Sequence, residues 1–184
     1  MSELTKKALA VSLKKLLSKK ELSKITISNI TDDCGVNRQT FYYHFKDIYD
    51  LLEWIFANEV VEKIEKETTI ETWQENFKYV LDYMLENKKF IIKTYNSLSR
   101  KTLLDFLFKQ YNTIFIDIIN DVSKNYNITK ENKIFIANFY KYGFAGIIEN
   151  WIVTEMIESP ENIIKKLDIL ISGNFEEAVR KMSN

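Results

Sequence analysis

The sequence of 184 residues contains one cysteine, Cys34, and one histidine, His44. A single cysteine cannot form an internal disulfide, and a single histidine cannot build a histidine-based metal site, so disulfide scaffolds and structural zinc sites are excluded. A lone free thiol fits a reducing compartment. We therefore expect a cytoplasmic protein that carries no metal and no cofactor.

Glycine and proline are also scarce, with four glycines and one proline in the whole chain. A composition so poor in turn-forming residues, with 46% hydrophobic and 28% charged residues, favours an ordered all-α protein. No window approaches the roughly 18 apolar residues of a membrane span, and the N-terminus lacks the pattern of a secretory leader. We expect no membrane partner.

Motifs that carry catalysis are missing as well. The chain has no glycine-rich phosphate loop, no nucleophile elbow and no cluster of metal ligands. The only histidine, His44, lies in the basic N-terminal segment, on the face expected to contact DNA. The sequence therefore predicts that the protein is not an enzyme.

The formal net charge is zero, but the charge is unevenly divided. Residues 1–46 hold nine Lys or Arg against four acids, a net charge of +5, and the remaining 138 residues carry the balancing −5. A basic head before an acidic body makes the head the candidate for contact with nucleic-acid phosphates. Lysines that merely solvate a helix are an equally good explanation of the charge alone.

Three helices are predicted in the basic head. Leucines at 9, 13, 16 and 17 recur at helical spacing and predict a helix over about 5–20. Thr26 or Ser28 can cap a second helix that stops at Gly35, and Asn37 can cap a third over about 38–45. Two short helices joined by a turn containing glycine form a helix-turn-helix, here about 26–45.

The third helix has one face for packing and one for recognition. Phe41 and Phe45, four residues apart, mark the core side, and advancing 100° per residue places Tyr43 directly opposite. The outward set has side chains that suit base edges and comprises Arg38, Gln39, Thr40 and Tyr43. Tyr42, His44 and Lys46 flank this set and suit phosphates. Each has an alternative structural role, such as Tyr42 in the core or His44 at the negative end of the helix.

The same stretch resembles the signature of the TetR family of bacterial regulators. The resemblance covers about residues 5–52 and rests on ITISNI at 25–30, CGVNRQTFYYHFK at 34–46, and Leu51-Leu52. It implies an all-helical dimer with a larger C-terminal domain that binds an effector. It also implies base-reading roles for the outward set and phosphate contacts for Thr26, Tyr42, His44 and Lys46. Ile48 stands where many members carry a second lysine, so one phosphate contact is missing.

From Asp47 the pattern is helical nearly to the end. Breaks at 68–69, 87, 97–99, 125–127 and 159–160 leave room for six helices, giving about nine in all. We expect a helix-turn-helix DNA-binding domain at 1–46 and a regulatory and dimerisation domain, a helical bundle, at 47–184. A helix of about 47–66 would join them.

The C-terminal half resembles the branch of the family that includes the activator of the dihydroxyacetone kinase operon. This similarity rests on FYKYGFAG at 139–146, Trp151 and Ser159-Pro160. Gly143 and Gly146 leave a notch in a bulky helix, where either a second backbone or an internal neighbour could approach closely. Together with the strong apolar face of 134–157, the notch predicts a homodimer interface within 130–172, which matches a palindromic operator.

The sequence thus predicts a sequence-specific DNA-binding transcription regulator, taken as a repressor under the control of a small-molecule effector. The alternative is an activator or repressor controlled by a protein co-regulator. Aromatic residues in the body suit either a ligand pocket or an ordinary core; they are Trp73, Phe77, Tyr83, Tyr95, Phe106, Tyr111, Phe115 and Tyr140.

Overall fold

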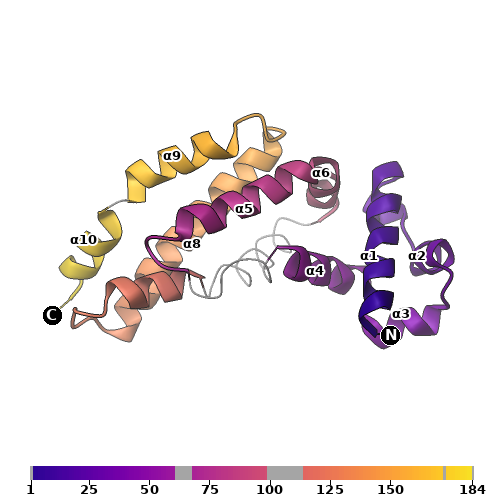
Figure 1. The fold of residues 1–184 in the computed structure, drawn as a ribbon, viewed down its shortest axis with the longest axis horizontal. Helices are drawn as coiled ribbons and strands as arrows, with labels where there is room; N and C mark the ends of the chain where they lie inside the picture. The colour runs from indigo at the N-terminus through magenta and orange to yellow at the C-terminus, as the bar shows by residue number, and fades with distance from the viewer. Residues whose placement is uncertain (1, 61–67, 99–113, 172, 184) are drawn as a thin grey trace. The chain divides into compact units, whose positions relative to one another are not determined.

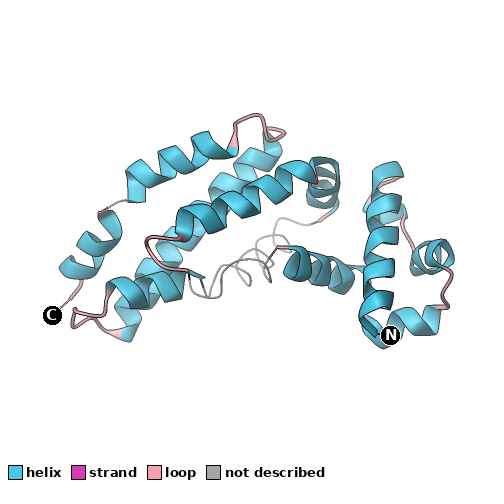
Figure 2. Ribbon diagram, in the orientation of Figure 1, coloured by secondary structure: helices cyan, strands magenta, loops and turns pink. Residues whose placement is uncertain are grey.

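The fold is described by a computed structural model for residues 2–60, 68–98, 114–171 and 173–183 (Figure 1). Within these ranges all regular secondary structure is helical, as Figure 2 shows, and the prediction of an all-α fold is confirmed. No helix in the same ranges is both long and apolar enough to cross a membrane. The predicted aromatic residues Phe106 and Tyr111 lie outside the described residues.

The chain divides into two compact units. The first contains Met1–Lys63 and Asn87–Ser99, and the second contains Ile64–Glu86 and Arg100–Asn184. The first unit is larger than the predicted head of 1–46 because two further helices pack with it. The boundary after residue 46 was drawn between a DNA-binding part and a regulatory part of the chain. This functional division stays a prediction.

In the first unit, helix α1 (Ser2–Lys19) contacts the other α-helices. Leu9, Leu13 and Leu17 are fully buried on it, since their spacing keeps them on one face. A 3₁₀ turn, η1 (Leu22–Lys24), leads to the remaining helices: α2 (Ile27–Cys34), α3 (Arg38–His44), α4 (Ile48–Glu59) and α6 (Lys88–Ser97).

Helices α4 and α6 complete this unit by packing beside α1. The rings of Phe56 and Phe90 lie 5.6 Å apart, and Lys93 donates a hydrogen bond to the Ser18 carbonyl over 3.0 Å. The predicted joining helix begins at Ile48 as expected. Helix α4 ends at Glu59 with Val60 as its C-cap, and the predicted end at about 66 lies outside the described residues.

The second unit has an aromatic centre at Phe144. The rings of Trp73, Phe77 and Phe115 meet it edge to face at 5.9, 4.9 and 5.0 Å. The rings come from three segments distant in sequence, so they hold the unit together. Its helical segments are α5 (Trp73–Glu86), residues 114–122, α8 (Lys130–Val153), α9 (Pro160–Ile171) and α10 (Asn174–Lys181).

The predicted breaks at 68–69, 87, 125–127 and 159–160 all fall between described helices, with Pro160 as the first residue of α9. A further break separates α9 from α10 and was not predicted. Gly173, the N-cap of α10, adopts φ 78°, a left-handed conformation that glycine takes without a steric penalty. Treating Pro160 as the last break was therefore wrong.

Candidate nucleic-acid interface

Specific residues mark both ends of helix α2. The Thr26 hydroxyl accepts from the Asn29 backbone N–H over 3.2 Å, and the Asn29 side chain accepts from the Thr26 N–H over 3.1 Å. This capping box satisfies two of the backbone donors that a helix start leaves unpaired. Gly35, with φ 69°, ends the helix and turns the chain toward α3.

Helix α3 has seven residues and is held by packing on one face. Phe41 is fully buried and Phe45 is 3% exposed, with their rings 5.9 Å apart. Phe45 also meets the ring of Trp54 on α4 at 5.9 Å. A helix this short has little stability alone, so this anchor fixes which side chains of α3 face outward.

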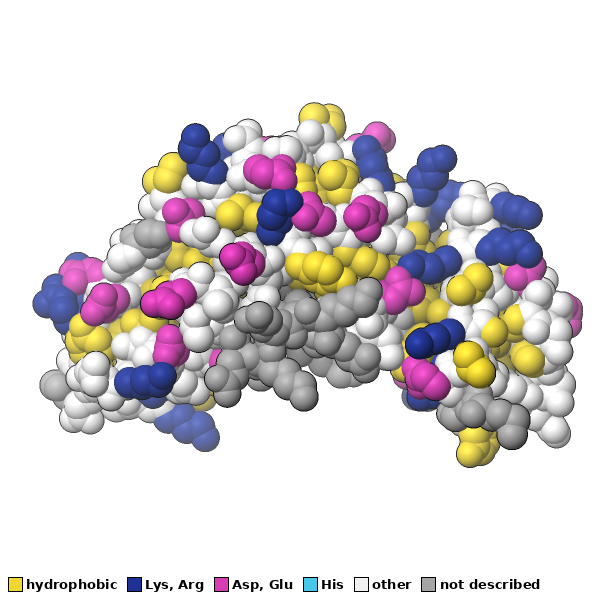
Figure 3. All heavy atoms as spheres, viewed as in Figure 1, with side chains coloured by type: hydrophobic (Ala, Val, Ile, Leu, Met, Phe, Trp, Pro, Cys, Tyr) yellow, Lys and Arg dark blue, Asp and Glu magenta, His cyan; other side chains and the backbone are white. Residues whose placement is uncertain are grey.

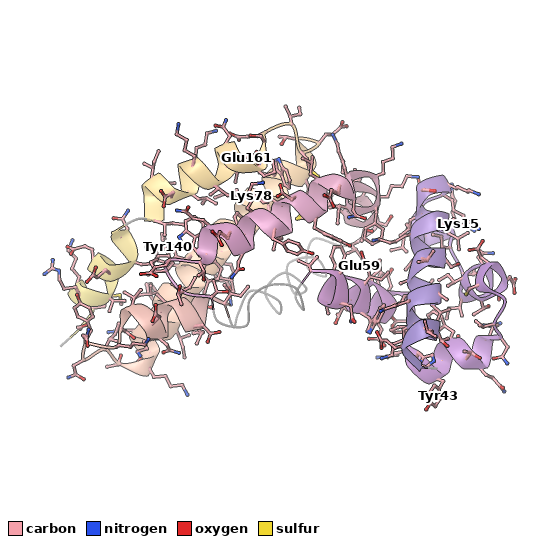
Figure 4. All side chains as sticks on the ribbon, in the orientation of Figure 1. Lys15, Tyr43, Glu59, Lys78, Tyr140 and Glu161 are labelled. Carbon is pink, nitrogen blue, oxygen red and sulfur yellow. The ribbon has the colours of Figure 1, made fainter. Side chains whose placement is uncertain are left out.

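The outward face carries the side chains predicted to read bases. Arg38 and Gln39 are exposed, and Tyr43 is 82% exposed and projects from the end of α3 in Figure 4. Thr40 differs because it is half-buried and its hydroxyl is engaged with Asn37. The structure thus brings the four residues together on one short helix.

The flanking residues are also accessible. Tyr42 is 53% exposed, so the alternative that it belongs to the core is wrong. Lys46 and Thr26 are exposed, and His44 is half-buried with its ring edge to face with Tyr43 at 4.9 Å. Thr26 lies at the start of α2, where its hydroxyl already accepts one hydrogen bond and keeps its own proton to donate.

Four acidic side chains of this unit are paired with lysines: Glu3, Glu21, Asp33 and Glu59. Lys15 on α1 donates to Asp33 on α2 over 2.6 Å, and this bond holds the pKa of Asp33 below its usual value. Lys14 on α1 pairs with Glu59 on α4 (Figure 4 labels Glu59). Figure 3 shows charges of both signs interspersed over the visible face. Since α3 itself contains no acid, its outward face is compatible with DNA phosphates.

Cys34 has a structural role at the end of α2. Its thiol donates to the Ile30 carbonyl at 2.9 Å, and desolvation by burial raises the pKa of the thiol. A thiol that stays protonated is a poor nucleophile. The residue therefore has no sign of reactivity and contributes to packing at the end of α2.

In the second unit, α8 has two apolar faces. Trp151 and Ile152 lie in the core, while a stripe of side chains on the opposite face is exposed to solvent in the single chain. At 100° per residue this stripe spans about 100° of the helix. It comprises Phe135, Phe139, Tyr142, Gly143, Gly146 and Val153.

The two glycines lie on this outward face. A Cβ built on Gly143 or Gly146 meets no atom of the described residues within 4 Å. Packing against these residues therefore does not require glycine at either position, which favours the approach of a second backbone over that of an internal neighbour. An exposed aromatic stripe beside small residues is typical of a surface that a second chain covers.

An apolar cavity lies within the second unit, between α5, residues 114–122, α8 and α10. Its free space is about 30 Å³, on a scale where one water needs about 10–15 Å³. Trp73, Phe77 and Phe115, three of the predicted aromatic residues, line it. Its polar lining residues are Thr68 and Asn76, whose side chains are hydrogen-bonded to each other at 3.0 Å.

Other predicted aromatic residues are packed rather than lining this cavity. Tyr83 is buried on α5, and Tyr140 stacks on Phe175 with ring centroids 3.8 Å apart (Figure 4 labels Tyr140). Tyr95 belongs to α6 in the first unit. The periodic pattern of the sequence does not distinguish these positions from the cavity wall, because both are apolar faces of helices.

Comparison with known proteins agrees with this geometry. A family model described as bacterial regulatory proteins, tetR family, matches residues 12–55, and one described as a transcriptional regulator C-terminal region matches residues 71–173. The HTH-type dhaKLM operon transcriptional activator DhaS of Lactococcus lactis subsp. lactis (strain IL1403) is 28% identical over 154 residues, covering 83% of this chain and 81% of that protein.

A solved structure of a dihydroxyacetone kinase operon activator, DhaS, superposes with a TM-score of 0.71 at 25% identity and covers 98% of each chain. These relatives are transcription regulators rather than enzymes, and regulators of this family bind DNA and act as dimers. The two family models together span both units. The chain belongs to the TetR family and is a DNA-binding transcription regulator that resembles the DhaS branch.

Proposed function

We propose that the protein binds a palindromic operator as a homodimer, with α3 of each copy in the major groove. The observation that carries this proposal is the outward face of α3, fixed by the buried pair Phe41 and Phe45. Arg38 can grip guanine and Gln39 can pair with adenine through two hydrogen bonds each, and Tyr43 can contact a thymine methyl. Thr26, Tyr42, His44 and Lys46 contact phosphates.

The dimer forms through the exposed stripe of α8 together with α9. On α9, Ile169 and Leu170 are 71% and 64% exposed in the single chain. A two-fold axis through this surface would pack two helices of one copy against two of the other, as the apolar side chains and the glycine notch favour. Two-fold symmetry also matches the proposed palindrome.

DNA binding is controlled by a small molecule that enters the second unit at the apolar cavity. Because the cavity is small, its aromatic walls must move to admit a ligand, and this movement can couple the cavity to the rest of the dimer. The protein acts as a repressor under this proposal. The relatives' names favour a second candidate, an activator, and a protein co-regulator is the alternative to the ligand.

Fluorescence anisotropy with duplexes from the promoter of the gene itself and of its neighbours tests DNA binding. We expect one duplex to bind at least about a thousandfold more tightly than a scrambled duplex at the same salt concentration. Equal affinity for all duplexes would contradict operator reading. Expression of the neighbouring genes after deletion of this gene decides the sign, since it rises for a repressor and falls for an activator.

A further inference from the structure

On the outward face of α3, the Thr40 hydroxyl already forms a hydrogen bond within the chain. Its backbone N–H donates to Asn37 Oδ1 over 2.8 Å, and its Oγ1 lies 2.9 Å from the same oxygen. A backbone N–H can only donate, so the Asn37 atom must be the amide oxygen rather than the nitrogen. The Thr40 hydroxyl therefore also donates to this oxygen.

This geometry limits what Thr40 can offer to a base. Its only proton is directed at Asn37, so Thr40 cannot donate to guanine N7 or O6, to adenine N7 or to thymine O4. A methyl group and one acceptor oxygen remain. The methyl group matches the 5-methyl of thymine, which the major groove displays for no other base.

We propose that Asn37 is a positioning residue that holds Thr40 so that its methyl group selects thymine in each half-site. The proposal rests on α3 entering the major groove. Asn37 combines two tasks here, since one oxygen caps α3 and fixes the Thr40 rotamer. The selection comes from apolar contact and not from a hydrogen bond.

The test uses the full-length protein and an operator in which each thymine of the half-site is replaced in turn by deoxyuridine, which lacks the 5-methyl group. For the wild type, replacement of the thymine that Thr40 contacts should weaken binding about fourfold, the effect of one lost methyl contact. A thymine contacted by Tyr43 is told apart because its effect persists in Thr40→Ser. Thr40→Val loses the hydrogen bond to Asn37, but valine has one strongly preferred rotamer in a helix, so a methyl group stays fixed and the variant should retain this sensitivity. Thr40→Ser keeps the hydroxyl and should lose it.

The positioning role is tested by Asn37→Asp and Asn37→Ala. Aspartate preserves the acceptor oxygen for the Thr40 hydroxyl. This variant should therefore still bind the deoxyuridine operator more weakly than the thymine operator, even though its charge weakens binding to both. Alanine removes the acceptor and should lower the sensitivity, with thermal melting and circular dichroism to establish that α3 still folds. If alanine unfolds the unit, the aspartate variant alone decides, because loss of its sensitivity would contradict the role.

Two results would overturn the proposal: no thymine replacement weakens wild-type binding, or Thr40→Ser keeps the full sensitivity of the wild type at every thymine. The second result would mean that the Thr40 methyl group contacts no thymine. Failure of the proposed function looks different, since the wild type would then bind no operator specifically in the absence of any replacement.

Discussion

Arg38 and Lys46 separate the two kinds of DNA contact proposed for this protein. Both side chains are exposed, Arg38 at the start of α3 and Lys46 just after its end. Arg38→Ala should cost about 1–3 kcal/mol of binding free energy and relax the preference at one base position. Lys46→Ala should weaken all sequences alike and flatten the plot of log affinity against log salt concentration by about one unit.

Anisotropy titrations at several salt concentrations, on the operator and on duplexes with single base changes, measure both effects. Lys24→Ala is a matched control, since Lys24 is also an exposed lysine of the same unit and has no proposed contact with DNA; its side chain lies 3.9 Å from Glu21. Should Arg38→Ala weaken all sequences by the same factor, Arg38 would contact the backbone and not a base.

Gly35 allows a prediction about stability. Its φ of 69° is left-handed, and an added Cβ would meet no atom within 4 Å, so a substitution suffers backbone strain without a steric clash. Gly35→Ala should lower the free energy of unfolding by about 1–2 kcal/mol, and Gly35→Asn by less, because asparagine tolerates this conformation better. Urea denaturation followed by circular dichroism checks the order. Equal stability of all three proteins would show that the turn relaxes.

Residue types and spacing were sufficient to predict most of the head. The pair Phe41 and Phe45 defines the inward direction of α3, and the opposite direction follows from helix geometry alone. The role of Asn37 in holding Thr40 was not predictable, because it depends on a rotamer and on a proton that sequence does not specify. The exposure of Tyr42 likewise became clear only from the structure.

At the scale of elements, α8 was predicted as one strong apolar face, and the structure separates it into a core face and an outward stripe. Helical spacing in a helix that is apolar nearly all round does not tell which side is covered by its own chain. The break at Gly173 was missed for a related reason. In sequence, a single glycine between two amphipathic segments looks the same as a glycine tolerated inside one continuous helix.

The outward stripe of α8 predicts that Gly146→Leu weakens the dimer. The added side chain has open space within one chain, so the fold should persist, but it would occupy the notch that a second copy approaches. Analytical ultracentrifugation should show the dimer dissociating at concentrations where the wild type does not. Phe139→Glu, which places a charge in the stripe, should act in the same direction.

Glu75→Leu serves as the control, because it adds an exposed leucine on α5, away from the stripe. A folded Gly146→Leu protein with unchanged dimer stability would remove the notch from the account. A monomeric wild type would remove the interface itself.

For the whole molecule, control requires that an effector distinguish two states of the dimer with different head spacing. Such coupling is typically worth about 1–3 kcal/mol. Trp54 on α4 is a suitable probe, since its ring lies 5.9 Å from Phe45 and 5.8 Å from Lys6 Nζ. In a variant with Phe at Trp73 and Trp151, a true effector should change Trp54 fluorescence and operator affinity over the same concentration range.

Trp151 donates to the Glu158 carbonyl over 2.7 Å, so thermal melting must establish that the probe variant is folded. An effector that changes affinity while the Trp54 signal stays flat would exclude α4 as the transmitter. If a co-expressed protein changes affinity and no metabolite does, the co-regulator alternative replaces the small-molecule proposal.

The central claim is that two copies of α3, related by two-fold symmetry, read DNA. Selection from fragmented genomic DNA with the purified wild-type protein tests it most directly. The account predicts enrichment of an inverted repeat whose half-sites are centred about 34–36 Å apart, or about 10–10.5 base pairs, or a multiple of this spacing. Enrichment of no sequence, or of sequences without inverted symmetry, would contradict it.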